Sequence, residues 1–150
     1  MSTAIPGFTN TRFIALALMM SGLIYLVPLI VTDIPGDSNA TLVVPLGVLA
    51  LGSAALSFML PRFMRRTKAE QAGLQGAVAA FQTRKIVQLA ICESILLYGF
   101  VASYMAHDPR LYVPFLVIGE LMMLVHFPRQ SVLEASLSDQ AMIELSSLIR

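Results

Sequence analysis

Four long apolar stretches constrain the fold of this 150-residue chain more than any other feature of its sequence. The first two contain no charged residue and the last two contain only a few ionisable ones; they cover residues 13–31, 40–60, 86–106 and 111–127. A helix needs about 20 mostly apolar residues to cross the hydrocarbon core of a bilayer, so each stretch predicts a membrane-spanning helix. We therefore expect an all-α integral membrane protein, folded as a single membrane domain.

The composition of the chain supports this class and excludes others. Apolar residues make up 57% of the sequence and charged residues 13%, whereas charged residues are about 25% of a soluble domain. The net charge of +1 lacks the excess of basic residues that nucleic-acid binding requires, so we expect no nucleic-acid partner. The first stretch is longer than the apolar part of a secretory signal peptide, about 7–15 residues, and we interpret it as a span.

The connections between the stretches predict how the helices are arranged. Residues 32–39 and 107–110 are short and rich in turn-forming residues, so the helices on either side of each should run antiparallel. The connection 61–85 is longer and carries six basic residues, namely Arg62, Arg65, Arg66, Lys68, Arg84 and Lys85. Basic residues are retained on the cytoplasmic side of a membrane. We therefore expect this loop and both termini to be cytoplasmic, which leaves only Arg110 of the ten basic residues outside.

Two cytoplasmic segments are predicted to form short helices. Residues 68–82 favour a helix, and because no breaker separates them from the third stretch, this helix either stands alone or extends that span. The tail, residues 128–150, has serines suited to helix capping and apolar faces typical of a helix that lies on the membrane surface. The six basic residues of the loop would then attract anionic lipid headgroups.

Two carboxylates inside the apolar stretches are the best candidates for function. Glu93 lies in the third stretch and Glu120 in the fourth, and burying such a group in a bilayer costs at least about 2.5–3.5 kcal/mol. Helix geometry puts Glu93 about 4.5 Å and Glu120 about 1.5 Å to the cytoplasmic side of the middle of their spans. The two carboxyl groups are thus predicted at nearly one depth on neighbouring helices. If they face each other, they would share one proton and titrate as a coupled pair.

A structural role for the same two carboxyl groups is the alternative. Each could form hydrogen bonds with polar side chains nearby, for which Ser94, Gln88 and Tyr98 are the candidates. Hydrogen bonds of this kind hold membrane helices together without any exchange of protons. The sequence leaves both interpretations open.

The residues around Glu93 also resemble a known ion-binding helix. Residues 90–101 read AICESILLYGFV, in which Ala90 precedes Glu93 by three positions and Tyr98 follows it by five, directly before a glycine. This pattern resembles the carboxylate helix of the proteolipid c subunit of rotary ATP synthases. The resemblance is local, covering about a dozen residues, and the first and fourth stretches have no counterpart in that two-helix family. It implies that Glu93 binds an ion, with Tyr98 and Ala90 shaping the site.

The sequence as a whole favours a proton-binding or ion-conducting subunit of a homo- or hetero-oligomer in a bacterial inner membrane. The alternative function is that of a structural or assembly protein in the same bilayer, with no transport activity. No enzyme motif is present, although a subunit of a membrane enzyme with its active site in another chain stays open. We expect no cofactor and no metal site, because the His and Cys residues lack metal-ligand spacing.

Overall fold

The computed structural model describes residues 8–31, 40–63, 74–129 and 131–133 of the chain. This part of the chain is helical and contains no strand, which confirms the all-α prediction. Its elements, in chain order, are α1 (Phe8–Ile24), α2 (Leu26–Val31), the 3-10 helix η1 (Ala40–Leu42), α3 (Val43–Phe63), α4 (Leu74–Ala106), the 3-10 helix η3 (Pro109–Leu111) and α5 (Tyr112–His126).

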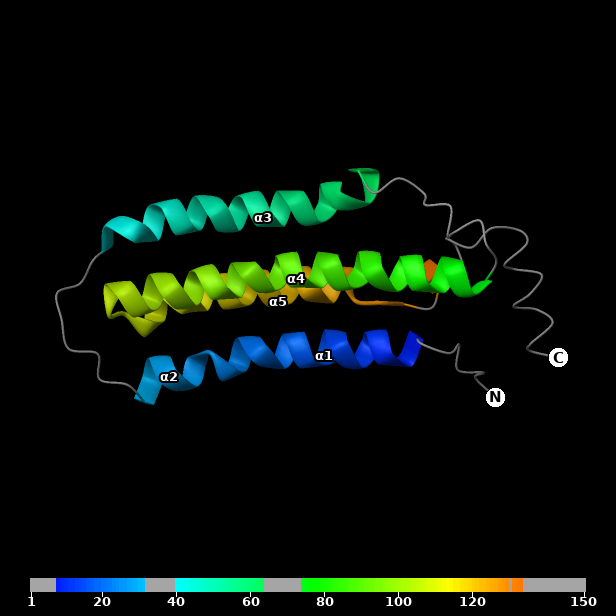
Figure 1. Ribbon diagram of the computed structural model, residues 1–150. Coiled ribbons are helices and arrows are strands. Elements are labelled where there is room, and N and C mark those ends of the chain that lie inside the picture. The colour runs from blue at the N-terminus through cyan, green and yellow to red at the C-terminus, as the bar shows by residue number, and fades with distance from the viewer. Residues whose placement is uncertain (1–7, 32–39, 64–73, 130, 134–150) are drawn as a thin grey trace.

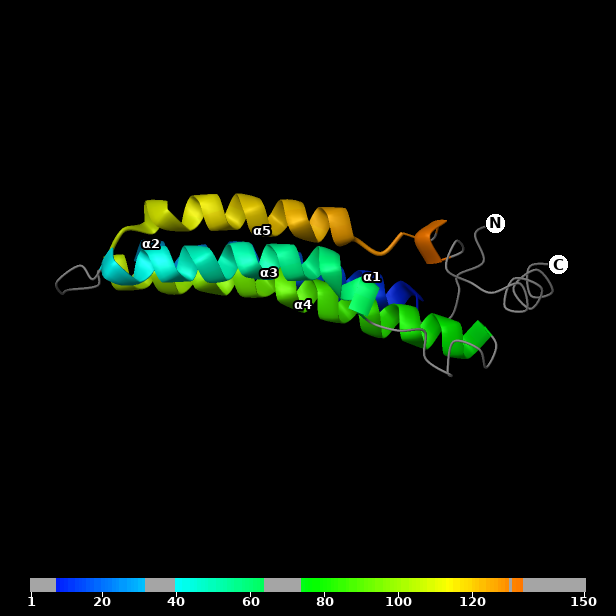
Figure 2. The ribbon, with the colours of Figure 1, turned by 90° about the horizontal axis from the view of Figure 1, so that it is seen from above.

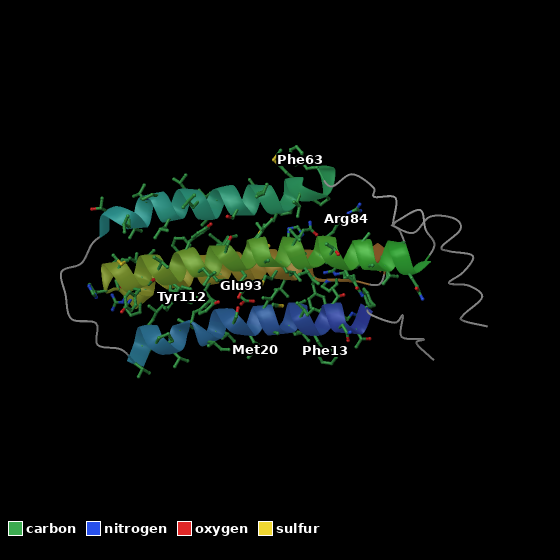
Figure 3. The ribbon with its side chains drawn as sticks, viewed as in Figure 1. Phe13, Met20, Phe63, Arg84, Glu93 and Tyr112 are labelled. Carbon is green, nitrogen blue, oxygen red and sulfur yellow. The ribbon has the colours of Figure 1, made fainter. Side chains whose placement is uncertain are left out.

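Four helical segments are long and apolar enough to cross a membrane, by length and composition. They are Phe8–Val31, which contains α1 and α2, then Val43–Pro61, Gln75–Ala106 and Pro109–His126. Each overlaps one of the four predicted stretches. Large apolar side chains such as Phe13, Met20 and Phe63 are more than half exposed on the outer faces, as expected of residues that contact lipid (Figure 3).

Of the two alternatives for residues 68–82, the structure shows the one in which the helix extends the third span, because α4 begins at Leu74 and continues without interruption into that span. Its additional turns bury Ala77, Val78 and Phe81. The ring of Phe81 packs near that of Phe8 in α1, with ring centroids 6.3 Å apart. Arg84 and Lys85 therefore belong to a helix that packs against α1. The sequence assigned these two residues to the connection 61–85, and the structure places them in the part of that connection that continues as helix into the span.

A break after Ile24 divides the first span into α1 and α2. Pro28 has no backbone N–H, so it cannot donate a hydrogen bond to the carbonyl oxygen of Ile24, four residues earlier. Tyr25 lies at the break, and its backbone N–H donates to the carbonyl oxygen of Ser21 at 3.1 Å. The last carbonyl groups of α1 therefore lie next to a site where side-chain donors can reach them.

The bundle is organised around α4, which packs against α1, α3 and α5. Figure 1 shows α1 and α3 on opposite sides of α4, and Figure 2 shows α5 and α4 on opposite sides of the plane that holds α1 and α3. The beginnings of α1 and α4 and the ends of α3 and α5 lie at one end of the bundle (Figure 1). We call this the basic end, because Arg12, Arg84 and Lys85 lie in the helix segments there. The opposite end, where η3 carries Arg110, is the η3 end.

Two glycines let α4 and α5 approach closely. A Cβ atom on Gly119 would lie 2.5 Å from Leu96 Cδ2, and one on Gly99 would overlap the side chain of Phe115. A Cβ atom on Gly47 of α3, by contrast, would meet nothing within 4 Å. Small residues at contacts let membrane helices pack backbone to backbone. The contact between α4 and α5 therefore depends on glycine at these two positions.

Candidate functional site

Glu93 lies near the middle of α4, on the face that packs against the last turn of α1 (Figure 3). Its Oε1 atom accepts a hydrogen bond from Ser21 Oγ at 2.9 Å and another from the Tyr25 hydroxyl at 3.2 Å. Ser21 and Tyr25 are four residues apart, so one turn of helix brings both hydroxyls to the same side. The side chain of Glu93 is thus held by donors from a different helix.

The hydroxyl of Ser21 has a second contact that bears on where a proton lies. Its Oγ atom is 2.6 Å from the carbonyl oxygen of Leu18 as well as 2.9 Å from Glu93 Oε1. A serine hydroxyl carries a single proton, so it donates fully to only one of these two oxygens. If Glu93 carries a proton, Glu93 donates to Ser21 and Ser21 donates to Leu18, and both contacts are satisfied at once.

Glu120 of α5 lies beside the next residue of α1. A Cβ atom on Gly22 would lie 2.6 Å from Glu120 Oε1, so the absence of a side chain at this position makes room for the carboxyl group. Glu120 Oε1 is buried and has no hydrogen-bond partner among the described residues. A buried polar oxygen without a partner is costly. The two carboxyl groups therefore have different surroundings, since Glu93 has two donors and the Oε1 atom of Glu120 has none.

Tyr112 of α5 completes the connection between the three helices. Its side chain is fully buried, and its hydroxyl donates a hydrogen bond to the carbonyl oxygen of Gly22 at 2.7 Å. Gly22 is in the last turn of α1, where carbonyl oxygens lack partners within the helix. We refer to Ser21, Gly22, Tyr25, Glu93, Tyr112 and Glu120 together as the carboxyl site.

The structure brings both predicted carboxylates against consecutive residues of α1, Ser21 and Gly22. Within the described part of the chain no hydrogen bond joins Glu93 directly to Glu120. Ala90 is exposed and Tyr98 is half-buried, and neither is among the hydrogen-bond partners of Glu93.

Two of the three polar partners that the sequence suggested for the carboxyl groups, Ser94 and Gln88, bond elsewhere. Ser94 Oγ donates to the carbonyl oxygen of Ile91 in its own helix, and Gln88 Nε2 donates to the carbonyl oxygen of Ser57 in α3. The partners of Glu93 come instead from the first span. The four-residue spacing of Ser21 and Tyr25 within an apolar stretch was the sequence signal that could have identified them.

A second group of buried polar side chains lies closer to the basic end. His126 Nε2 is 3.2 Å from Ser57 Oγ, and the carbonyl oxygen of Ser57 accepts the bond from Gln88. All three residues are at most 6% exposed. The ring of Phe58 packs near the imidazole of His126, with centroids 5.1 Å apart. This group joins α3, α4 and α5, and its members are bonded to one another, whereas Glu120 Oε1 of the carboxyl site has no partner among the described residues.

The predicted membrane-surface residues are only partly described by the structure. Arg65, Arg66 and Lys68 lie outside the described residues, and Arg62 is in α3 although its side chain is not described. Lys85 Nζ lies 5.9 Å from the centre of the Phe81 ring. At the beginning of α1, the guanidinium of Arg12 lies 4.6 Å from the centre of the Phe8 ring. Each of the two neighbouring rings, Phe8 and Phe81, thus has a cation near it.

Removing a donor to Glu93 should loosen the attachment of α1 to α4. We expect Ser21→Ala and Tyr25→Phe each to lower the unfolding free energy by about 0.6–2 kcal/mol, the range for hydrogen bonds between membrane helices. Ser94→Ala is the matched control, because Ser94 bonds only within its own helix. The measurement is unfolding by SDS in mixed micelles. An equal loss in Ser94→Ala and Ser21→Ala would show that the interhelical bond is not what stabilises the bundle.

Among the described residues, no group of three or more His, Cys, Asp or Glu side chains is arranged to hold a metal ion. Comparison of the chain with protein-family models, with curated proteins and with solved structures gave no match. The fold and the site therefore define the class: an all-α protein with four candidate membrane spans and two carboxyl groups gathered at the last turn of its first helix.

Proposed function

We propose that this protein binds and releases protons inside the membrane at the carboxyl site, as a proton-binding or ion-conducting subunit of an oligomer. The observation that carries the proposal is the contact of Ser21 with both Leu18 and Glu93. A proton on Glu93 completes this set of hydrogen bonds, and its loss leaves the Ser21 hydroxyl shared between two acceptors. The site thus has a distinct arrangement for each protonation state of Glu93.

Glu120 makes the proposed site a pair. Two ionised carboxylates in apolar surroundings repel each other, so a pair that shares one proton is less costly than a pair with none. Glu120 and Glu93 lie against neighbouring residues of α1, and the buried Oε1 atom of Glu120 has no donor among the described residues. In the proposed cycle, the proton is held by the pair and passes between the two groups.

The proposal also includes an orientation in the membrane. The helices form an antiparallel four-span bundle with the basic end in the cytoplasm, so that both termini are cytoplasmic and Arg110 is outside. The distribution of basic residues between the two ends supports this orientation, by the rule that Lys and Arg are retained inside. At the basic end, anionic lipid headgroups would neutralise Arg84, Lys85 and the basic residues that precede them in the sequence. The membrane we propose is a bacterial inner membrane.

A structural or assembly function is the second candidate, and one observation favours it. The hydrogen bonds from Ser21 and Tyr25 to Glu93, and from Tyr112 to Gly22, fasten α1 to α4 and α5. A protein that serves only as a packing scaffold would need these bonds but no exchange of protons. Glutamine at position 93 would keep the bonds and remove the proton, so the two functions differ in their response to that substitution.

Infrared spectroscopy of the purified protein in lipid tests the proposal directly. We expect a carbonyl stretching band from a protonated carboxyl group that shifts in D2O and disappears as the pH is raised. Glu93→Gln and Glu120→Gln should each change the intensity of this band or the pH at which it is lost. Ser94→Ala should leave both unchanged. A band that neither glutamine variant affects, in a folded protein, would contradict proton binding at the site and favour the scaffold function.

A further inference from the structure

The buried polar atoms that lack partners all lie in one part of the described chain. They are Glu120 Oε1, Ser103 Oγ and His107 Nδ1. Ser103 is only 1% exposed, so its hydroxyl is enclosed by protein. α4 runs from Glu93 toward the η3 end (Figure 1). Ser103 follows Glu93 by ten residues in this helix, and His107 is the turn residue directly after its end at Ala106. The unpartnered atoms therefore extend from the carboxyl site toward the η3 end.

The opposite direction, from the carboxyl site toward the basic end, has a different character. Five fully buried residues form an apolar cluster there: Ala15, Leu89, Cys92, Leu96 and Met123. Leu96 lies at the level of the site, against Gly22 and Gly119, and the other four continue toward the basic end. Beyond them, the buried polar side chains of Ser57, Gln88 and His126 are joined to one another. Among the described residues of this half of the bundle, no buried side-chain polar atom lacks a hydrogen-bond partner.

The same face of α4 changes from apolar to polar along its length. Leu89, Leu96 and Ser103 are spaced by seven residues, which is two helical turns, so they lie almost in line on one face. The first two belong to the apolar cluster, and the third has an unpartnered hydroxyl. The contacts of Gly99 with Phe115 and of Leu96 with Gly119 set the register of α5 against α4. One more turn in this register brings Ser103 to the level of Tyr112.

Tyr112 links this polar region to the carboxyl site. Its hydroxyl reaches Gly22, beside Glu120, while its backbone belongs to the first turn of α5 next to η3. Figure 3 shows Tyr112 between Glu93 and the η3 end of the bundle. A tyrosine hydroxyl that donates one bond can still accept another. Tyr112, Ser103 and His107 thus provide successive polar groups between the site and that end.

Buried polar groups without a protein partner are usually satisfied by ordered water. We propose that water enters the bundle from the η3 end, past His107 and Ser103, and reaches the carboxyl site, and that the apolar cluster keeps water from reaching it from the basic end. The entry of water is inferred from the positions of the unpartnered atoms and of the apolar cluster, independently of the proposed function. The consequence that Glu93 and Glu120 exchange protons with the η3 side rests on the proposed function.

The ionisable groups fall into three sets: those at the site, those at the η3 end of the route, and those on the side of the apolar cluster. Glu93, Glu120, Tyr25 and Tyr112 surround the site itself, and His107, Asp108 and Arg110 lie at the mouth of the route. Lys85, Cys92 and His126 lie on the other side, within or beyond the apolar cluster. Protons that follow the water therefore meet the titratable groups of the η3 end first.

Reaction of single thiols with silver ion tests the route. Ag⁺ is small, travels in water and combines with thiols. In a Cys92→Ala background we introduce Ser103→Cys, which changes the side chain little. The native chain is the matched control, because its one thiol, Cys92, is equally buried but lies in the apolar cluster. After exposure to Ag⁺, the protein in vesicles is denatured and its remaining free thiol is measured with a fluorescent maleimide.

A third variant establishes which end of the bundle faces outward. Arg110→Cys in the same background reacts with an impermeant maleimide only in molecules whose η3 end is outside. We expect external Ag⁺ to consume the thiol of Ser103→Cys in that fraction of molecules, about tenfold faster or more than it consumes Cys92, because water carries Ag⁺ to the first thiol and the apolar cluster encloses the second.

Several results would overturn the proposal. One is slow reaction of both thiols at the same rate, and another is faster reaction of Cys92. A third is reaction of Ser103→Cys only in molecules with the basic end outward. Gel filtration and circular dichroism verify that each variant is folded. Ser103→Ala in the Cys92→Ala background should give the same signal as that background alone, which confirms that the introduced thiol is the reacting group. The reaction with Ag⁺ releases the proton of the thiol itself, but it requires no proton transfer by Glu93 or Glu120. A positive result without proton exchange would refute the proposed function alone, and proton exchange without a silver reaction would refute the route alone.

Discussion

Replacing Glu93 or Glu120 with glutamine should reduce proton movement across vesicles that contain the purified protein to the rate of empty vesicles. Glutamine keeps the size of the side chain and its ability to form hydrogen bonds, but it cannot carry a proton at neutral pH. Glu93 in particular keeps an acceptor for Ser21 and Tyr25 in this substitution. The measurement is the change of internal pH, reported by a trapped dye, after a membrane potential is imposed.

Ser94→Ala is the control for this experiment, because the residue is next to Glu93 in sequence but bonds to Ile91 of its own helix. It should conduct as the parent protein does. If the parent protein moves no protons above the background of empty vesicles, conduction by this chain alone is refuted. If the glutamine variants conduct as well as the parent, the carboxyl groups are not the path, and the hydrogen bonds of Glu93 serve the packing of α1.

Among the glycines of the described helices, Gly99→Ala should be the most destabilising substitution by alanine. The new Cβ atom would overlap the Cβ and Cγ atoms of Phe115, which are close to the backbone of α5 and cannot turn away. α4 and α5 must then move apart, and we expect a loss of about 1–3 kcal/mol of unfolding free energy, typical of overpacking. The loss is measured by SDS unfolding in mixed micelles.

Gly52→Ala in α3 is the matched control, since a Cβ atom there meets nothing within 4 Å. Alanine favours a helix over glycine by about 1 kcal/mol, so this variant should be as stable as the parent or slightly more stable. The close contact of α4 with α5 would be disproved if both alanine variants showed the same stability.

The spans were predictable from sequence because the length of an apolar stretch is a local property. The beginning of α4 was harder to predict, since Leu74 to Lys85 is amphipathic and its helix is stabilised by packing of Phe81 against Phe8, 73 residues earlier in the chain. The break at Tyr25 was predictable in principle, because Pro28 has no N–H to donate to the carbonyl oxygen of Ile24.

The carboxyl site was predictable only in part. Glu93 and Glu120 stand out because charges are rare in the apolar stretches, and counting residues gives their depth. Which neighbour each one meets depends on the rotation of every helix about its own axis, and that rotation is set by close contacts such as those of Gly22 and Gly119. Ser21, Tyr25 and Tyr112 were therefore missed as partners. The ion-binding roles of Tyr98 and Ala90, which come from the c-subunit resemblance, stay predictions.

The hydrogen bonds of the carboxyl site also dictate an order of events during synthesis of the chain. Ser21 and Tyr25 precede their partner Glu93 by 72 and 68 residues, and Gly22 precedes Tyr112 by 90. When the first span leaves the ribosome, the hydroxyls of Ser21 and Tyr25 have no partner from another helix. A nascent chain that stops after α3 still lacks Glu93, and the site is complete only once α5 has been made. The first span must therefore remain unpaired at this site while most of the chain is completed.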